Sequence, residues 1–419
     1  MRRLQAETTD CYRLFHGAVE GCPGLTVDRY GTVVLVQTFR DPPGDFGPST
    51  VDELCRLASV AINSAEAGGA AQLQSPPSSD PAAAAAASPV GTTDTVFLPV
   101  WNDRRKKERP RRGGGGGEQA EVGVPPPHKL SSDHEPPLEA LGVKVGLENG
   151  VRYPLAARHR GIDPWLFLDL RATRTWMLRN SKGMEVLNLF SYTGGVAAAA
   201  ACGGAKNVWN VDFSTSAHEV GRASLKLNAG SAGTCQCDWM KLDVLPTIRQ
   251  LAGIATKDYR RDKGGKNAQR DGGRGGRGRG GRGGSSFGGY GEGSRGGRGV
   301  GRRGGDEAPK PEPRIVKPRQ FDLVFLDPPT WSQSAHGTVD LVRDYQSLFK
   351  PSLLATKEGG AVVATNHVST VDCAEWVESL TRCAAKAGRE VQSVQVILPE
   401  EDFPSPDGRH PLKVAIFRV

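Results

Sequence analysis

The sequence predicts an α/β protein built on a parallel β-sheet, with a small α+β domain before it and disordered inserts. An aliphatic run at 186–190 meets Ser-Tyr-Thr-Gly-Gly, and an alanine-rich segment of high helix propensity follows. A second aliphatic run, 207–211, ends in Asp212, and a third, 321–326, ends in Asp-Pro-Pro. Strand, glycine turn, helix and strand in this order form a βαβ unit, which sets parallel strands side by side.

Composition indicates that part of the chain lies outside any core. The 419 residues suffice for two or three domains, but only 37% are hydrophobic, and there are 54 Gly and 29 Pro. Residues 257–319 carry 18 Lys and Arg and 7 Asp and Glu, so their formal charge of +11 exceeds the +8 of the whole chain. The rest of the protein is close to neutral.

Several classes of protein are disfavoured. The 8 Cys include no CxxC pair and no His cluster at zinc spacing, which predicts reduced thiols and no metal. No segment approaches the ~18 apolar residues of a membrane span, and the amino terminus does not resemble a secretory signal. We therefore expect an intracellular protein without a membrane or metal partner.

The small α+β domain is assigned to residues 1–140. Strand patterns at 24–39 turn at Tyr30-Gly31, a helix is expected over 51–62, and 95–100 is a short strand candidate. Two inserts interrupt this domain, at about 65–93 and 102–137. The basic run in the second is either a solvated loop or a loop that contacts phosphates.

Residues 141–419 form the second domain. An Asn-Gly turn at 149–150 predicts a hairpin, and strands and helices then alternate to a closing antiparallel pair at the sheet edge. The stretch 339–356 is predicted to be helical. The Gly-Arg tract at about 257–319 cannot bury a core and is expected to be disordered; its Arg, Phe and Tyr suit contact with RNA, or it is a solvated tail without a specific partner.

The glycine turn and Asp212 indicate a nucleoside pocket. A carboxylate about 20 residues after such a turn suits a ribose, whereas the turn lacks the spaced glycines and the lysine that phosphate groups require. S-adenosylmethionine, which has an adenosine but no phosphate, fits better. The third strand is expected to end at Asp238, a carboxylate that would either hold the adenine amino group or cap the next helix.

Ordered motifs give the chain a family resemblance. EGCPGLTVDRYG, LENGVRY, WLFLDLRATR, VLNLFSYTGG, FDLVFLDPPTW, VRDYQSL and DFP occur in sequence. Together they resemble the class I S-adenosylmethionine-dependent methyltransferases of bacterial-type large-subunit ribosomal RNA, which act on cytosine carbon 5 or guanine N7. The resemblance implies a Rossmann-like sheet over residues 141–419. The PUA domain that often precedes it is expected to be absent, since the match begins near residue 8.

The resemblance also implies site residues. The cofactor would be bound by residues of the first strand end and its turn, namely Asn188, Ser191, Tyr192, Thr193 and Gly194, together with Asp212, Asp238 and Asp327. Asp169 and Arg171 resemble the lid on the cofactor side of the family, although Arg171 and Arg174 would equally form helix-surface ion pairs.

The chemistry expected depends on the end of the fifth strand. Family members that methylate cytosine carbon 5 need a cysteine there, because the ring must first be attacked by a thiolate. This chain has Ala-Thr-Asn-His at 364–367, which resembles the guanine N7 branch, and Cys373 is expected to be a buried small residue. Catalysis would then rest on positioning by Asn366 and by Asp327, Pro328 and Pro329.

Two further side chains remain ambiguous. Trp331 would stack on an extruded target base or belong to the core. His367 is expected to be a polar group at a strand end and not a general base.

The sequence therefore predicts a methyltransferase that acts on RNA, with ribosomal RNA as the expected substrate. Methylation of a protein or small-molecule amine is the alternative, since Asp-Pro-Pro also suits an amino group, and a non-catalytic RNA-binding relative is a third. The compartment is left open between cytoplasm, an organelle and the nucleolus.

Overall fold

The computed structural model describes residues 8–39, 46–73, 97–103, 144–156, 165–254 and 316–419, apart from 335, 336, 341 and 343. The chain divides into two compact units, residues 1–254 with 317–419 and residues 255–316. The described residues belong to the first unit, except Val316. Almost all of the Gly-Arg tract and most of the two predicted inserts lie outside the described residues.

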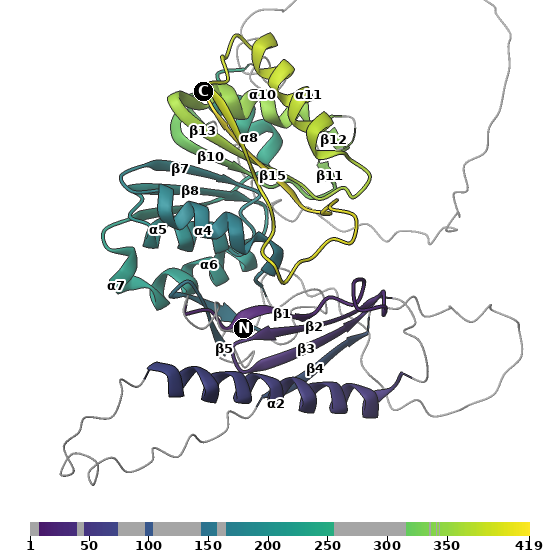
Figure 1. Cartoon of the computed structure of the whole chain (residues 1–419). Coiled ribbons are helices and arrows are strands. Elements are labelled where there is room, and N and C mark those ends of the chain that lie inside the picture. Colours follow the sequence, from purple (N-terminus) through teal and green to yellow (C-terminus); the bar gives the residue numbers. More distant parts are fainter. Residues whose placement is uncertain are drawn as a thin grey trace, which may run out of the picture. The chain divides into compact units, whose positions relative to one another are not determined.

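A seven-stranded sheet carries the second half of the fold (Figure 1). Its order is β14-β15-β13-β10-β7-β8-β9, with bounds β7 Glu185–Leu189, β8 Asn207–Asp212, β9 Gln236–Lys241, β10 Phe321–Leu326, β13 Thr356–Asn366, β14 Ser393–Ile397 and β15 Lys413–Arg418. The five strands from β13 to β9 are parallel, and β15 pairs antiparallel with both β13 and β14. The predicted α/β class and the antiparallel edge are confirmed.

Two groups of helices pack with this sheet (Figure 1). The first comprises α4 (Arg171–Asn180), preceded by the 3₁₀ turn η2 (Leu168–Leu170), then α5 (Gly195–Cys202), α6 (Thr215–Leu227) and the short α7 (Ala229–Ala232); the second comprises α8 (Val244–Leu251), α10 (Gln346–Leu354) and α11 (Cys373–Lys386). Residues 197–201 of α5, all alanine, are no more than 1% exposed. Small side chains let this helix lie close against its neighbours, so the alanine run serves packing as well as helix propensity.

Residues 8–103 contribute a second sheet, of order β1-β2-β3-β4. Its strands are β1 (Cys11–Phe15), β2 (Leu25–Tyr30), β3 (Val33–Thr38) and β4 (Leu98–Asp103), and helix α2 (Pro48–Leu73) packs on it. Here the sequence prediction was wrong about length. Helix α2 continues eleven residues beyond the predicted end at 62, because the Ala-rich stretch keeps helix propensity although it has few large apolar side chains.

The hairpin of β5 (Lys144–Glu148) and β6 (Val151–Leu155) was correctly predicted from its turn. Asn149 and Gly150 have φ angles of 49° and 76°, as a two-residue hairpin turn requires. Asp10, which precedes β1, donates its backbone N–H to the carbonyl of Leu147 at 2.9 Å. A single core cluster contains Tyr30 of β2, Tyr153 of β6 and Ala198 of α5, so the hairpin packs with both sheets' cores.

The region after Asp-Pro-Pro differs from its prediction. None of the described residues between 339 and 345 is helical; β11 (Trp331–Ser334) and β12 (Gly337–Asp340) form a two-stranded hairpin, and α10 begins only at Gln346. The apolar spacing of Val339 and Leu341 is compatible with a strand as well as a helix, which is the usual ambiguity of short runs. The hairpin therefore follows directly on the carboxyl end of β10.

Candidate functional site

The site is centred on the turn after β7. Between Leu189 and α5, Phe190, Tyr192 and Gly194 have φ angles of 56°, 45° and 70°. Left-handed backbone is costly for residues other than glycine, so this turn stores strain of the kind found at ligand sites. A Cβ on Gly194 would lie 2.5 Å from Cη2 of Trp239, so packing permits only glycine there.

Asp212 joins this turn to the end of β8. One carboxylate oxygen accepts a hydrogen bond from the backbone N–H of Tyr192 at 3.0 Å, and the other accepts from Ser214 at 2.9 Å. The side chain is buried. Each oxygen retains a lone pair, so the carboxylate holds the turn in place and can still accept hydrogen bonds from a ligand.

A small cavity of about 40 Å³ opens beside the turn and is lined by Asn188, Ser191, Thr193 and Asp327, among others. Asn188 donates from its side chain to Oδ1 of Asn210 at 2.9 Å, and its own Oδ1 is buried without a partner among the described residues. Burying an acceptor unpaired costs about 1–3 kcal/mol, so such a group is expected to meet a ligand. The Thr193 hydroxyl, by contrast, already donates to the carbonyl of Trp165 at 2.6 Å.

These residues fit S-adenosylmethionine. The unpaired Oδ1 of Asn188 suits the ammonium of the methionine end, and Asp212 suits the ribose hydroxyls. Asn188, Ser191 and Asp212 would hold the molecule at the carboxyl ends of β7 and β8, where open α/β sheets bind ligands. Bound there, it supplies an electrophilic methyl group.

Asp327 lies at the end of β10 and forms the centre of a polar cluster. Its Oδ1 accepts a hydrogen bond from the hydroxyl of Thr365 and lies 2.7 Å from Nε2 of His367. Burial lowers the pKa of His367, but the neighbouring carboxylates of Asp327 and Asp169 outweigh it, so the pKa is raised above its usual 6.5. No described residue donates a hydrogen bond to Oδ2 of Asp327, which leaves this oxygen open to a substrate.

Asn366 ends β13 beside this cluster. Its Oδ1 accepts from the backbone of Val368 at 2.9 Å, and its Nδ2 is buried without a partner in the described chain. Pro328 and Pro329 lie in the short segment that connects β10 with β11. Trp331 begins β11, but its side chain lies outside the described residues, so neither expectation for it is tested.

Asp169, in the 3₁₀ turn, lies near the same cluster. Burial raises the pKa of Asp169 above its ordinary value, His367 opposes this shift, and Asp327 adds to it. The structure therefore brings the turn after β7, Asp212, Asp169, Asp327 and Asn366 to one edge of the fold.

The guanidinium of Arg171, which resembles a lid residue on the cofactor side of the family, is held in the interior of the fold. It is 2% exposed and donates to both carboxylate oxygens of Asp402, at 3.0 and 2.5 Å, and to the carbonyl of Cys11 at 3.2 Å. Arg174 is buried as well and forms two hydrogen bonds with Glu148, at 2.7 and 2.5 Å. The alternative of helix-surface ion pairs was therefore wrong, because both pairs are interior.

The predicted strand end at Asp238 was also wrong. Strand β9 continues to Lys241, and Asp238 lies opposite Trp209 in the parallel register, three residues before that end. Its carboxylate is 3.3 Å from the side-chain nitrogens of Asn207 and Gln236. The carboxylate that follows the strand is Asp243, which caps α8 through Leu245 N–H at 3.0 Å. The position of Asp238 does not support a role at the adenine.

Sequence reasoning missed three participants. Thr365 and His367 were not assigned as partners of Asp327, and Asp402 was not assigned as the partner of Arg171. The Asp-Phe-Pro motif contained the only signal for Asp402. The pairing itself spans 231 residues and cannot be read from local spacing.

The described residues contain no group of three His, Cys, Asp or Glu side chains placed to hold a metal ion. No helix among them combines the length and the apolar character needed to cross a membrane.

The chain is similar to known S-adenosylmethionine-dependent methyltransferases. Residues 131–250 match the model of the S-adenosylmethionine-dependent methyltransferase family. The chain is 22% identical over 401 residues to ribosomal RNA large subunit methyltransferase I of Shigella flexneri, covering 96% of this chain and 72% of that protein. It is 27% identical over 208 residues to ribosomal RNA large subunit methyltransferase K/L of a Shewanella species, covering 49% of this chain but only 20% of the relative.

Solved structures show the same fold. SMU.776, assigned as a methyltransferase and solved with SAH bound, aligns with a TM-score of 0.55 at 18% identity, covering 99% of this chain and 78% of that one. A protein of Streptococcus mutans assigned as a SAM-dependent methyltransferase aligns with a TM-score of 0.53 at 17% identity, covering 99% and 77%.

Proposed function

Because this chain is an S-adenosylmethionine-dependent methyltransferase, we propose that it methylates a base of large-subunit ribosomal RNA, at a guanine nitrogen rather than at carbon 5 of cytosine. The similarity to large subunit methyltransferase I extends over nearly the whole chain, which supports ribosomal RNA as the substrate class. An RNA substrate of this kind also implies an intracellular protein.

The choice of a ring nitrogen over cytosine carbon 5 rests on the residues at the end of β13. Thr365 contacts Asp327, and Asn366 follows it as the last residue of the strand, where a cytosine carbon-5 enzyme needs a thiolate. Cys373 is the next cysteine along the chain; it begins α11, and burial raises the pKa of its thiol, which disfavours the thiolate. A ring nitrogen has a lone pair of its own, so methylation there needs no protein nucleophile.

Asp327 has a role suited to this chemistry. A ring nitrogen gains positive charge as it takes up a methyl group, and a fixed carboxylate stabilises charge that develops beside it. Thr365 and His367 both contact Oδ1, so they fix the orientation of the carboxyl group and leave Oδ2 for the base. Asn366, with its unpaired Nδ2, would position a carbonyl or ring acceptor of the same base.

The test is transfer of tritium from labelled S-adenosylmethionine to total RNA, followed by nucleoside digestion. Label in 7-methylguanosine that is lost in Asp327→Asn supports the proposal, and Asp322→Asn at the opposite end of β10 is the matched control. Label in 5-methylcytidine would overturn the nitrogen assignment. If RNA takes no label although the protein binds the cofactor, the acceptor is a protein or small-molecule amine instead.

A further inference from the structure

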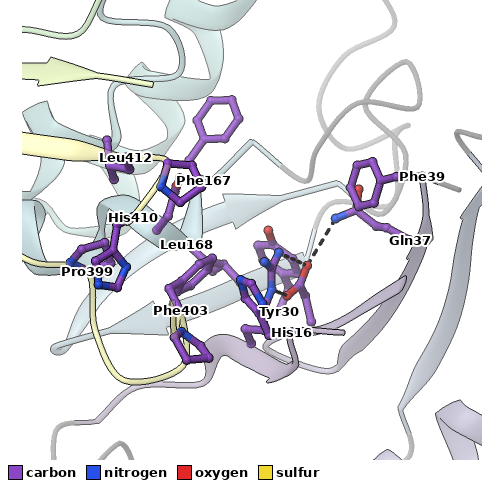
Figure 2. Close-up of a pocket in the computed structure, with 15 residues that line it drawn as sticks. His16, Tyr30, Gln37, Phe39, Phe167, Leu168, Pro399, Phe403, His410 and Leu412 are labelled. Atoms are coloured by element: carbon purple, nitrogen blue, oxygen red, sulfur yellow. Dashed lines mark hydrogen bonds and ion pairs between the residues drawn. The ribbon is translucent and has the colours of Figure 1, made fainter. Parts of the chain in front are cut away.

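A second cavity lies next to the cofactor site. Figure 2 shows it between β3, the 3₁₀ turn and the loop that leads to β15, and its volume is about 240 Å³. Phe167, at the start of the 3₁₀ turn, lines both this cavity and the small cavity beside Asn188. The two spaces therefore share a wall. A volume just below the ~300 Å³ lower limit of pockets for drug-sized ligands suits a single flat ring system.

One acceptor in this cavity has an orientation fixed by its neighbour. The side-chain amide of Gln37 donates from Nε2 to Oδ2 of Asp28 at 3.2 Å, as the dashed line in Figure 2 marks. A carboxylate can only accept, so Nε2 must face Asp28 and Oε1 must face away. That Oε1 is buried and has no partner among the described residues, and Gln37 is only 7% exposed.

The two charged side chains near Gln37, Asp28 and Arg13, already pair with each other. Asp28 accepts from Arg13 at 2.7 and 3.2 Å, so the two charges compensate each other, and the Arg13 guanidinium lies 4.5 Å from the ring centroid of Phe403. Burial, with a smaller contribution from Arg13, lowers the pKa of His16 below its ordinary value, which disfavours the charged imidazolium. The cavity therefore offers little charge of its own on this side.

Asp169 supplies the second acceptor. It lines the cavity from the 3₁₀ turn, and no described residue donates a hydrogen bond to its carboxylate. The cavity thus presents the unpaired acceptors of Gln37 and Asp169, the unpaired Nδ1 of His16 and an aromatic side chain, Phe167, that is 45% exposed.

We propose that this cavity holds the target base after it leaves the RNA helix, and that Gln37 and Asp169 select guanine by accepting hydrogen bonds from its N1–H and 2-amino group. This assignment rests on the function proposed above and deepens it. Guanine is the base that presents a ring N–H beside an exocyclic amino group, whereas adenine and cytosine present an acceptor beside theirs. Enzymes that act on extruded bases read this same edge.

The direct test is nucleotide binding to the full-length protein saturated with S-adenosylhomocysteine. GMP, AMP and CMP are titrated separately and followed by calorimetry. We expect GMP to bind best, and Gln37→Met and Asp169→Asn each to weaken GMP binding about tenfold or more, since each loses a hydrogen bond to a buried acceptor. Equal binding of the three nucleotides, no GMP binding at millimolar concentration, or unchanged affinity in both variants would overturn the assignment.

Matched variants control for folding. Gln392→Met and Asp52→Asn make the same chemical changes at exposed positions outside the cavity and should leave GMP binding unchanged. Retained S-adenosylhomocysteine binding shows that Gln37→Met and Asp169→Asn are folded. Since Asp169 has no hydrogen bond to lose within the described protein, its variant remains informative if Gln37→Met is unstable.

RNA methylation separates this inference from the proposed function. If the wild-type protein labels no RNA but labels an amine, the proposed function fails and the base assignment fails with it. If RNA guanine is labelled, and Gln37→Met and Asp169→Asn label it at the wild-type rate, only the cavity assignment fails. Loss of guanine labelling in both variants, with cofactor binding intact, supports both.

Discussion

The guanidinium of Arg171 binds both carboxylate oxygens of Asp402, 231 residues further along the chain. The same carboxylate accepts the backbone N–H of Arg13 at 2.9 Å, and Arg171 also donates to the carbonyl of Cys11. Strand β1, the start of α4 and the loop before β15 therefore meet at one buried ion pair. Because that loop also contributes Phe403 to the cavity of Figure 2, the pair fixes one of the cavity walls.

Replacing Arg171 with methionine should destabilise the protein by about 3–5 kcal/mol, because the carboxylate of Asp402 would be left buried without its cation. The measurement is the free energy of unfolding in urea. Arg382→Met removes an exposed pair with Glu378 and should cost less than about 1 kcal/mol. Similar losses of unfolding free energy in the two variants would show that the buried pair stabilises the protein no more than the exposed pair does.

Local patterns predicted the elements whose partners are near in sequence. The strand, turn and helix at 185–202, and the Asn149-Gly150 hairpin, depend on β propensity, left-handed turn residues and alanine content, all visible within a few residues. Asp212 followed from the same unit, because the end of β8 is fixed by its parallel pairing with β7.

Features that depend on distant partners were not predictable. Arg171 resembled a cofactor residue because its partner Asp402 is remote. His367 was expected to be a polar group at a strand end, but its partner could not be named because Asp327 is 40 residues away. The error at Asp238 has another cause: β9 continues through Trp239, Met240 and Lys241, and short strands with mixed polarity give no clear end in sequence.

The pair of His367 and Asp327 should be visible by titration. We expect the His367 imidazole to titrate above its ordinary pKa of 6.5, and Asp327→Asn to lower that midpoint, since an opposing charge is removed. Histidine ¹⁵N chemical shifts against pH measure both values. A midpoint that does not move in the variant would show that the carboxylate does not stabilise the imidazolium.

The raised pKa of His367 also determines how its contribution to protein stability changes with pH. A pKa raised in the folded state stabilises the protein fully below the unfolded value, about 6.5, and this stabilisation is lost as pH rises through the folded-state pKa. The difference in unfolding free energy between wild type and His367→Gln should therefore be larger at pH 6 than at pH 9. A difference that grows with pH would contradict the assignment.

Gly221 of α6 should not tolerate alanine. A Cβ there would lie 2.1 Å from Cη2 and 2.4 Å from Cζ3 of Trp239, so either the indole or the helix must move. We expect Gly221→Ala to cost about 1–3 kcal/mol in unfolding free energy. Gly230→Ala in α7, where a Cβ meets nothing within 4 Å, should instead be neutral or stabilising. Combining Gly221→Ala with Trp239→Leu should recover part of the loss, and no recovery would exclude the steric cause.

Asp212 and Asp238 provide the sharpest comparison at the cofactor site. Asp212→Asn puts an amide nitrogen where the carboxylate now accepts from Tyr192 or Ser214, and it removes the negative charge that a ribose would meet. Losing a charge-assisted hydrogen bond of about 1.5–3 kcal/mol should weaken S-adenosylhomocysteine binding by about 10- to 150-fold in calorimetry. Asp238→Asn, in the middle of β9, should bind as the wild type does. If Asp238→Asn weakens binding and Asp212→Asn does not, the adenosine lies elsewhere than the turn after β7, and the cofactor assignment of Asn188 falls with it.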